Sequence, residues 1–435
     1  RVSEVSLEFE EIFKYPTPGL LAEHLEQPAA KQQSEKNLLE ELNYQNLDSV
    51  LSANSMEGKA EETVCEHDLG NVLLTGVTGF LGIHILMELL KRQEIWNKIY
   101  CLVRPTKRLT AEKRLRSVLF YYGEGNWEEF LGSRLTAVEG NIENNEIFAA
   151  PFAAHIDTVI NCAADVSHFA YDDKLERVNT QGVQHLLDFC RRQRGSFVQI
   201  STISISGFSQ KTQPPRTLTE QKLYIGQTIR NQYILSKYMA EYELLTAAVK
   251  DKIPVKMMRV GNLQGRLSDG EFQMNGRTNG FIRRLSTYVK LGKAPQSVWE
   301  SSVNISPVDE VARCIVALCT LPEQYTVFHV YPPESVSYSR IFSVLEEAGY
   351  PIEILPDGEF QDFLSQVEQT RKGKSVLEGL LLEREEKEMQ ENSISEIFTE
   401  EMLKKLGEHW NPVTDHYLRQ YFKILEEYRM FEESI

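Results

Sequence analysis

A tyrosine and a lysine four residues apart, Tyr233 and Lys237, form the residue pair in this sequence best suited to chemistry. On a helix they share one face. An ammonium group lowers the pKa of a nearby phenol, which otherwise titrates near about 10. Such a pair can hydrogen-bond a carbonyl oxygen and protonate it while a hydride reaches the carbon. The alternative is a plain amphipathic helix, because this spacing is common.

Two hydroxyl residues, Ser201 and Thr202, end an apolar run that predicts a strand over 197–201. The Thr202 hydroxyl is a candidate second donor to the same carbonyl oxygen. Thr202, Tyr233 and Lys237 are therefore the predicted catalytic residues.

An apolar run over 72–75 leads into three glycines, Gly76, Gly79 and Gly82, and then into an apolar helical pattern. This order of strand, tight turn and helix is typical of a dinucleotide-binding turn. In it, Gly76 allows the turn, Gly79 admits a pyrophosphate and Gly82 lets the helix lie close to the sheet. Free N–H groups and the helix dipole then hold phosphates. An ordinary glycine-rich turn is the alternative. The predicted cofactor contacts of this turn are Thr75, Gly76, Thr78, Gly79, Phe80, Leu81 and Gly82.

Arg104 follows the strand expected over 99–103. In dinucleotide folds an acidic residue here binds the ribose 2′-hydroxyl, whereas an arginine accommodates a 2′-phosphate. A guanidinium also pairs with phosphate in a bidentate manner. Arg104 therefore favours NADPH, with Arg114 as a further contact; a surface cation is the alternative.

Strand-like runs alternate with helical patterns between residue 71 and about residue 330. This alternation indicates a parallel sheet with helices on both faces. The predicted fold class is α/β, a Rossmann-like doubly wound parallel sheet with a mostly helical C-terminal subdomain. Strands are expected over 72–75, 99–103, 135–139, 158–161, 197–201, 255–259 and 328–331.

The composition is that of a globular chain, with 42% hydrophobic and 25% charged residues in 435. The net charge of −16 disfavours nucleic acid and anionic membranes as partners. No apolar run reaches the roughly 18 residues of a membrane span. Six scattered cysteines without a Cys-x-x-Cys pair predict buried thiols in a reducing cytoplasm and no metal site.

The N-terminal region predicts a small helical unit over 1–26 and a linker over 27–69, in which leucines dock on the next domain. The run Phe13-Lys14-Tyr15-Pro16-Thr17 resembles the last two helices of an acyl or peptidyl carrier domain, although a generic helical hairpin is the alternative. Residues 70–335 are expected to form the nucleotide-binding domain and 336–435 the helical subdomain. The chain begins at Arg1 and is expected to be a piece of a larger protein.

Residues 71 to about 335 resemble the extended short-chain dehydrogenase/reductases. Within them, the chain is similar to the thioester reductase domains that end nonribosomal peptide synthetases and to related carboxylic acid reductases. Besides the glycine turn, Ser201-Thr202 and Tyr233 with Lys237, the matching motifs are Cys101-Leu102-Val103-Arg104, Arg114-Leu115, Gly140-Asn141-Ile142, Asn161-Cys162-Ala163-Ala164, Arg259-Val260-Gly261-Asn262 and Pro307-Val308-Asp309. The family usually has Gly-Asp where this chain has Gly140-Asn141, so adjusted contacts to adenine are expected.

The resemblance implies that NADPH reduces a peptidyl or acyl thioester held on a carrier's phosphopantetheine and releases an aldehyde, which a second round would reduce to an alcohol. It implies an upstream carrier domain as partner, a monomeric excised domain, and Lys237 on the nicotinamide ribose. The further cofactor contacts that it implies are Asn141, Ile142, Cys162, Ala163, Ala164, Asn179, Ser201, Val260 and Asn262. Taken alone, Asn179 is more typical of a helix cap than of a site residue.

Three other functions fit the same scaffold: a nucleotide-sugar epimerase or dehydratase, a fatty acyl-CoA reductase, and a redox-silent cyclase or docking module. The carrier-like N-terminus and Arg104 disfavour the first, the carrier-like N-terminus alone disfavours the second, and Tyr233 disfavours the third. His168, Phe169, Met274 and Phe281 are candidate acyl-pocket residues, although each is more typical of plain packing. The basic runs 191–194 and 283–284 are candidate contacts to an acidic carrier or simply solvated surface.

Overall fold

The computed structural model describes residues 38–55, 64–123, 125–166, 174–273, 276–368, 380 and 389–431. The carrier-like stretch 1–26 and the first part of the expected linker lie outside these residues. The chain divides into two compact units. Unit 1 comprises Arg1–Arg259, Val316–His329 and Gln390–Leu406, and unit 2 comprises Val260–Ile315, Val330–Met389 and Gly407–Ile435.

The largest sheet has seven strands in the order β13-β8-β5-β4-β1-β2-β3. β1 pairs in parallel with both β2 and β4, so that Thr75 lies opposite Leu102 on one side and Asn161 on the other. The chain therefore reverses its winding direction at β1 and β4, where doubly wound sheets bind ligands. All seven expected strands are confirmed: β1 Asn71–Thr75, β2 Lys98–Val103, β3 Leu135–Glu139, β4 Thr158–Asn161, β5 Ser196–Thr202, β8 Val255–Val260 and β13 Val327–Val330.

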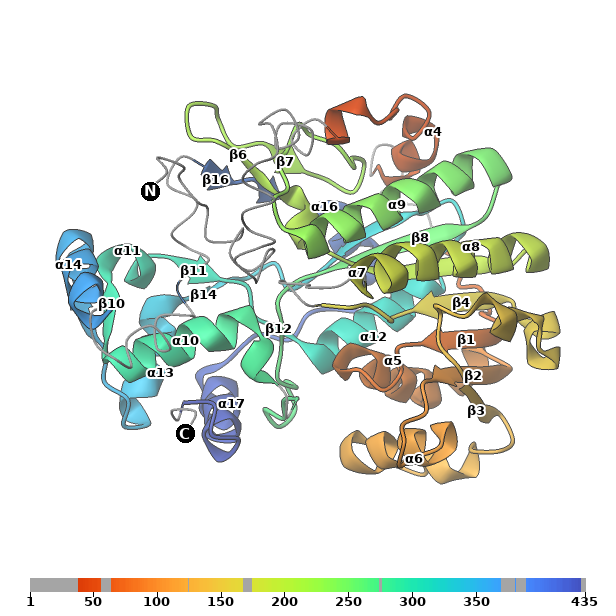
Figure 1. The fold of residues 1–435 in the computed structure, drawn as a ribbon, viewed down its shortest axis with the longest axis horizontal. Helices are drawn as coiled ribbons and strands as arrows, with labels where there is room; N and C mark the ends of the chain where they lie inside the picture. Colours follow the sequence, from red (N-terminus) through yellow and green to blue (C-terminus); the bar gives the residue numbers. More distant parts are fainter. Residues whose placement is uncertain are drawn as a thin grey trace, which may run out of the picture. The chain divides into compact units, whose positions relative to one another are not determined.

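Helices cover both faces of this sheet in unit 1. Figure 1 shows α8 (Gly182–Gln193) and α9 (Gln232–Asp251) on one face and α5 (Phe80–Lys91) on the other. Asn231 begins α9, since its side chain accepts a hydrogen bond from the Ile234 N–H. Among the described residues, the other α-helices of this unit include α4 Asp48–Leu51, α6 Ala111–Tyr122, α7 Lys174–Glu176 and α16 Ile397–Lys405.

Residues 38–55, the first described part of the expected linker, pack against the sheet domain as predicted. Leu39, Leu47 and Leu51 are buried in the same core cluster as α9 residues. The hydroxyl groups of Tyr44 and Tyr238 are 2.7 Å apart and form a hydrogen bond. These contacts fix the segment on the outer surface of α9.

The division between the units differs in detail from the boundary expected near residue 335. Residues 390–406 join unit 1, because β17 (Ser393–Ile394) pairs in parallel with β7 (Thr217–Leu218). The Thr399 N–H and hydroxyl both donate to Glu220, at 3.0 and 2.9 Å. Residues 260–315 join unit 2.

Unit 2 is mostly helical and has an aromatic core. Tyr288 contacts Phe342 and Phe360, and the Tyr421 hydroxyl donates to Gln264 at 2.6 Å. α12 (Val308–Cys319) contributes residues to both units. The other main elements are α10 Gly280–Leu291, α11 Gln296–Trp299, α13 Tyr338–Glu347, α14 Asp357–Glu368, α17 Asp415–Glu427, β9 Leu263–Gln264, β10 Lys293–Pro295, β11 Ser302–Val303, β12 Ser306–Pro307, β14 Val336–Ser337 and β15 Glu353–Leu355.

Four of the six cysteines follow the sequence expectation, and Cys162 is partly exposed. Cys101, Cys190, Cys314 and Cys319 are buried free thiols, whereas Cys65 is exposed. The expectation was wrong for Cys65 because it stands among exposed charged residues just before β1. In the described ranges, no helix has both the length and the apolar character needed to cross a bilayer.

Candidate functional site

The glycine turn after β1 lies directly against the loop that follows β4. Gly76 has a φ of 66°, and a Cβ at this position would collide with the backbone of Cys162 and Ala163. A Cβ at Gly82 would collide with the Gly76 carbonyl oxygen. Gly82 therefore lets α5 pack closely against its own turn.

The N-terminus of α5 is suited to an anionic group. Its N-cap, Gly79, is exposed and provides no side-chain cap for the first N–H groups of the helix. A Cβ at Gly79 would meet only the Gly76 oxygen, at 3.2 Å, so space remains above the turn. A helix terminus of this kind binds phosphate through its unpaired N–H groups.

A buried polar ladder, missed by sequence reasoning, joins the ends of three strands. The Thr75 hydroxyl donates to Asn161 Oδ1 at 2.5 Å, and Asn161 Nδ2 donates to Gln199 Oε1 at 2.8 Å. Asn161 Oδ1 also accepts from the Ala163 N–H at 3.2 Å. The ladder fixes the loop under Gly76. The sequence signal for this ladder was Gln199, a polar residue within the apolar strand β5.

Asn179 lies in a π-helical turn, Arg177–Gln181, and connects the loop after β4 to α9. Its Oδ1 accepts from the Asp165 N–H at 2.8 Å, while its Nδ2 donates to the Asp165 carbonyl at 2.9 Å and to Ser236 Oγ at 3.0 Å. These partners make Asn179 a positioning residue for the helix that carries Tyr233, and not a helix cap.

The predicted pair on α9 lies beside the end of β5. Lys237 Nζ is buried, donates to the Ile200 carbonyl at 2.9 Å and lies 6.0 Å from the centroid of the Tyr233 ring. Ile200 stands two residues before Thr202, so α9 and the end of β5 bring the three catalytic candidates into one region.

The two side chains have strongly shifted pKa values. Burial lowers the pKa of Lys237 to about 8, although Cys162 and Glu241 act in the opposite direction. Burial raises the pKa of Tyr233 to about 12. The expectation that the ammonium lowers the Tyr233 pKa was therefore wrong. Desolvation of the phenolate dominates, and the ammonium is directed toward the Ile200 carbonyl.

The two hydroxyls at the end of β5 differ in their partners. Thr202 Oγ1 donates to Ser204 Oγ and accepts from the Ser204 N–H, both at 3.2 Å. Ser201 Oγ is buried and has no hydrogen-bond partner among the residues that the structure describes. An unpaired buried hydroxyl is costly, so its position here fits a contact to a bound group.

Two guanidinium groups lie together at the carboxyl end of β2, next to β1 in the sheet. Arg114 Nη1 donates to the Arg104 carbonyl at 2.8 Å. Partial burial and the charge of Arg104 lower the pKa of Arg114. Within the described ranges, neither arginine forms an ion pair with a carboxylate. A second anionic group near the glycine turn would thus meet unneutralised positive charge.

The remaining predicted cofactor contacts have varied surroundings. Asn141 Oδ1 accepts from the Asn144 N–H at 3.0 Å, so its NH2 group is the part suited to a base. The side chains of Thr75, Leu81 and Ile142 are buried, and any nucleotide contact from them is expected through the backbone. Thr78, Phe80, Cys162, Ala163 and Ala164 are partly exposed beside the turn, while Val260 and Asn262 belong to unit 2.

Of the candidate pocket residues, Phe281 is buried in α10, as the packing alternative predicted. His168, Phe169 and Met274 lie outside the described residues.

A fully buried ion pair lies behind α9, the helix that carries Tyr233 and Lys237, and was not predicted from the sequence. The Arg259 guanidinium donates to Glu241 at 2.8–3.2 Å, and both side chains have 0% exposure. Arg259 also donates to the Lys222 carbonyl at 3.1 Å and to His329 Nε2 at 3.0 Å. Burial and the Arg259 charge hold the pKa of His329 well below its usual value. Its Nδ1–H therefore donates to the Ser395 carbonyl, at 2.6 Å.

Glu241 follows Lys237 by one helical turn, and this spacing was the available sequence signal for the pair. The Arg259–Glu241 pair thereby joins α9 to β8 and to the loop before α9.

Comparison with known proteins gives a consistent result. Residues 74–315 match the NAD_binding_4 family model, described as male sterility protein. A thiolation-reductase di-domain from an archaeal non-ribosomal peptide synthetase is 34% identical, with a TM-score of 0.85 over 99% of this chain and 89% of that one. The aureusimine biosynthetic cluster reductase domain is 25% identical, with a TM-score of 0.75 over 90% of this chain and 98% of that one.

Among curated proteins, glycine betaine reductase ATRR from Emericella nidulans is 28% identical over 69% of this chain and 24% of its own length. L-2-aminoadipate reductase from Saccharomyces cerevisiae is 27% identical over 81% of this chain and 27% of its own. The chain thus spans about a quarter of the length of these two relatives. UDP-glucuronic acid 4-epimerase from Bacillus cereus, at 15% identity and a TM-score of 0.54, shares the fold alone.

Proposed function

The chain belongs to the NAD_binding_4, or male sterility, family of NAD(P)-binding oxidoreductases, and on that premise we propose that it reduces a carrier-bound peptidyl or acyl thioester with NADPH and releases an aldehyde. One observation carries this proposal: Lys237 Nζ donates a hydrogen bond to the Ile200 carbonyl and lies over the Tyr233 ring. Ile200 stands two residues before Thr202, so the three candidate residues lie in one region. The glycine turn and the loop after β4 lie in the same unit, at the same edge of the sheet.

The residues around the turn support NADPH as the cofactor. The α5 N-terminus suits the pyrophosphate, Ser201 Oγ lacks a partner among the described residues, and Arg104 and Arg114 suit a 2′-phosphate. Asn141, Ile142, Cys162, Ala163 and Ala164, all in unit 1, are proposed as the surrounding contacts.

In this proposal NADPH supplies the hydride that reaches the thioester carbon. Tyr233 and Thr202 hydrogen-bond the carbonyl oxygen as it gains charge, and Thr202 exchanges its Ser204 contact for this oxygen. Because its raised pKa keeps Tyr233 protonated, it gives its proton to the oxygen and forms a hemithioacetal. Collapse of the hemithioacetal breaks the C–S bond and yields an aldehyde and the carrier thiol. Lys237 holds the nicotinamide ribose.

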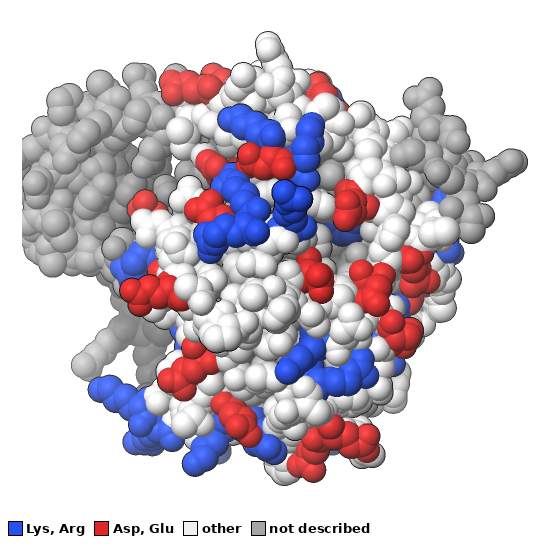
Figure 2. Space-filling view, turned by 90° about the vertical axis from the view of Figure 1, so that its right-hand side faces the viewer, with Lys and Arg blue, Asp and Glu red and all other residues white. Residues whose placement is uncertain are grey.

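A carrier domain is the proposed partner, in keeping with the thiolation-reductase di-domain that resembles this chain. The basic run 191–194 is a poor docking site for thioester delivery. It ends α8, at the edge of unit 1 opposite the carboxyl ends of the strands (Figure 1). Figure 2 faces this edge and shows basic side chains interleaved with acidic ones. Arg191 itself bonds to Asp188 and Asp251, at 2.6 and 2.8 Å.

The direct test loads acyl groups on phosphopantetheine or a short thiol mimic, follows NADPH by its absorbance and identifies the product by mass. Aldehyde formed in step with NADPH consumption supports the proposal, and a four-electron product would appear as the alcohol. NADPH binding without consumption on every thioester tested would favour a redox-silent module instead.

Cofactor choice gives a first prediction, for Arg104→Ala. Loss of a bidentate contact to phosphate, worth about 1.5–3 kcal/mol, is expected to raise the KM for NADPH roughly 10–100-fold and to leave the KM for NADH nearly unchanged. Steady-state kinetics with both cofactors measures this. Arg108→Ala, on the same exposed loop, is the control. Equal effects on the two cofactors would remove Arg104 from 2′-phosphate recognition.

The lowered Lys237 pKa gives a second prediction, for the pH profile. The ammonium is present below about pH 8 and is lost above it. If the ammonium is the working form, kcat/KM for NADPH should fall as pH rises through about 8, because this ratio reports the free enzyme. A Lys237→Arg variant that retains activity should lose this fall. A wild-type profile that stays flat to pH 9 would contradict the assigned role.

A further inference from the structure

A cavity of about 350 Å³ opens in unit 1 where the strands begin. Thr158, Ser196 and Lys256, at or next to the first residues of β4, β5 and β8, lie in its wall. Because the strands are parallel, this edge of the sheet is opposite the glycine turn and the α9 pair. The cavity is therefore separate from the proposed reductase site.

Lys256 is the unusual residue of this cavity. Its side chain is only 7% exposed, and Nζ donates to the Pro322 carbonyl at 3.1 Å. Burial lowers the Lys256 pKa to about 8, although Cys319 and Glu323 act in the opposite direction. Desolvated amines of this kind are the ones proteins use as nucleophiles toward carbonyl groups. The reductase chemistry does not use Lys256.

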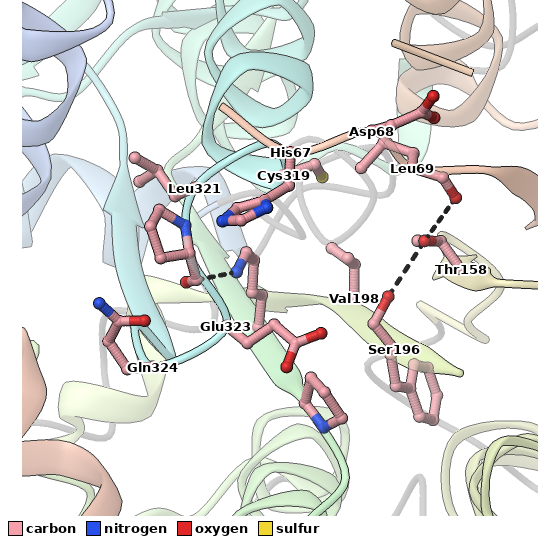
Figure 3. A pocket seen from close by; sticks show the side chains of 14 residues that line it. His67, Asp68, Leu69, Thr158, Ser196, Val198, Cys319, Leu321, Glu323 and Gln324 are labelled. Atoms are coloured by element: carbon pink, nitrogen blue, oxygen red, sulfur yellow. Dashed lines mark hydrogen bonds between the residues drawn. The ribbon is translucent and has the colours of Figure 1, made fainter. Parts of the chain in front are cut away.

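The wall of the cavity around this amine is partly polar and partly apolar. Figure 3 shows the His67 ring and the Glu323 carboxylate on two sides of the cavity. The backbone N–H of His67 donates to the Thr320 carbonyl at 2.8 Å and holds the residue in place. Leu69, Phe197, Val198 and Leu321 supply apolar wall.

The other polar groups of the wall are engaged or unreactive. Ser196 donates to Thr158, and Thr158 donates to the Leu69 carbonyl, at 3.0 and 2.8 Å (Figure 3). Asp68 accepts from the Gly70 N–H at 2.6 Å. Burial raises the pKa of the Cys319 thiol to about 12, so this thiol stays protonated and does not compete as a nucleophile.

We propose that Lys256 is a carbonyl-capturing amine and that this cavity is a covalent binding site for an aldehyde. The neutral amine adds to the aldehyde carbon, and the resulting carbinolamine loses water to give an imine. A C=N bond replaces the C=O bond, with no change in oxidation state. The carbonyl oxygen leaves as water together with the two hydrogens of the amine, so the step balances without a further acid. An aldehyde fits because a neutral, partly apolar ligand avoids the Asp68 and Glu323 carboxylates. The aldehyde released by the proposed reductase is a candidate ligand for this cavity. Only that part of the inference rests on the proposed function.

The test treats the whole chain with hexanal and sodium cyanoborohydride, which fixes an imine as a stable alkylamine, and locates the adducts by peptide mass spectrometry. At pH 7.5 Lys256 is expected to react roughly tenfold or more faster than Lys250, an exposed lysine near the end of α9. The Lys256 rate should level off above about pH 8.

Two comparisons sharpen the result. NADPH should leave the Lys256 rate unchanged; protection of Lys256 would mean that this cavity is not separate from the nucleotide site, and would overturn the proposal. Lys256→Met should remove the fast adduct, and Lys250→Met should keep it. Labelling of Lys256 no faster than that of Lys250 also overturns the proposal. Because the aldehyde is added, failure of thioester reduction leaves this test unaffected.

Discussion

Replacing Tyr233 by Phe is expected to lower the rate of thioester reduction by roughly 10²–10³-fold or more, the usual effect of removing one donor to a developing oxyanion. The loss should exceed this range if the phenol is also the proton source, because the mechanism proposes no other group that could protonate this oxygen. NADPH affinity should stay within about twofold, since the glycine turn and Lys237 are retained. Single-turnover reduction and NADPH fluorescence titration measure the two quantities.

Tyr242→Phe is the matched control for this variant. Tyr242 stands on the same helix, but its hydroxyl is directed to the Asn43 carbonyl, at 3.5 Å. This control should reduce the thioester at nearly the wild-type rate. If Tyr233→Phe also kept the wild-type rate, Tyr233 would not be part of the mechanism.

Replacing Arg259 by Met should have the largest effect on stability, a loss of about 3–5 kcal/mol in the free energy of unfolding. The variant leaves Glu241 buried and unpaired and removes the donors to the Lys222 carbonyl and His329. An unpaired buried carboxylate is costly, since the protein interior does not replace its hydration. Urea unfolding followed by tryptophan fluorescence measures the loss.

Two further variants show whether the loss of stability comes from the buried ion pair or would follow from replacing any arginine. Arg191→Met removes an exposed arginine that pairs with Asp188 and Asp251, and it should cost less than about 1 kcal/mol. The double variant Arg259→Met with Glu241→Leu should recover much of the stability, because no buried charge remains unpaired. Equal losses for Arg259→Met and Arg191→Met would show that the buried pair contributes no more than a surface one.

The local pattern of the sequence was enough to predict the elements that build the site. Each strand of the central sheet is a short apolar run between turn residues, and these runs carry the same signal whatever packs around them. The glycine turn was equally readable, because Gly76 is required by its own backbone angle and by the close approach of Cys162 and Ala163. The spacing of Tyr233 and Lys237 placed both on one helical face for the same reason, since helical periodicity is a local property.

Electrostatic behaviour, in contrast, was decided by the tertiary structure. Spacing suggested that Lys237 lowers the Tyr233 pKa, but burial raises it and directs the ammonium to the Ile200 carbonyl. Desolvation depends on every group that surrounds a side chain, and those groups come from segments distant in sequence. The pairing of Arg259 with Glu241 follows the same principle, because it joins a strand to a helix.

The tertiary structure also decided which distant segments meet. Residues 390–406, expected in the helical subdomain, add β17 and α16 to unit 1 through contacts to β7 and Glu220. Lys256 gave no signal within its apolar strand, and only the meeting of three strand ends with the segment 67–69 makes it a buried amine beside a cavity. The sequence by itself determined the strands, the turn and the helical faces, since these depend on neighbours along the chain. Burial, charge pairing and cavities depend on neighbours in space and were determined only by the fold.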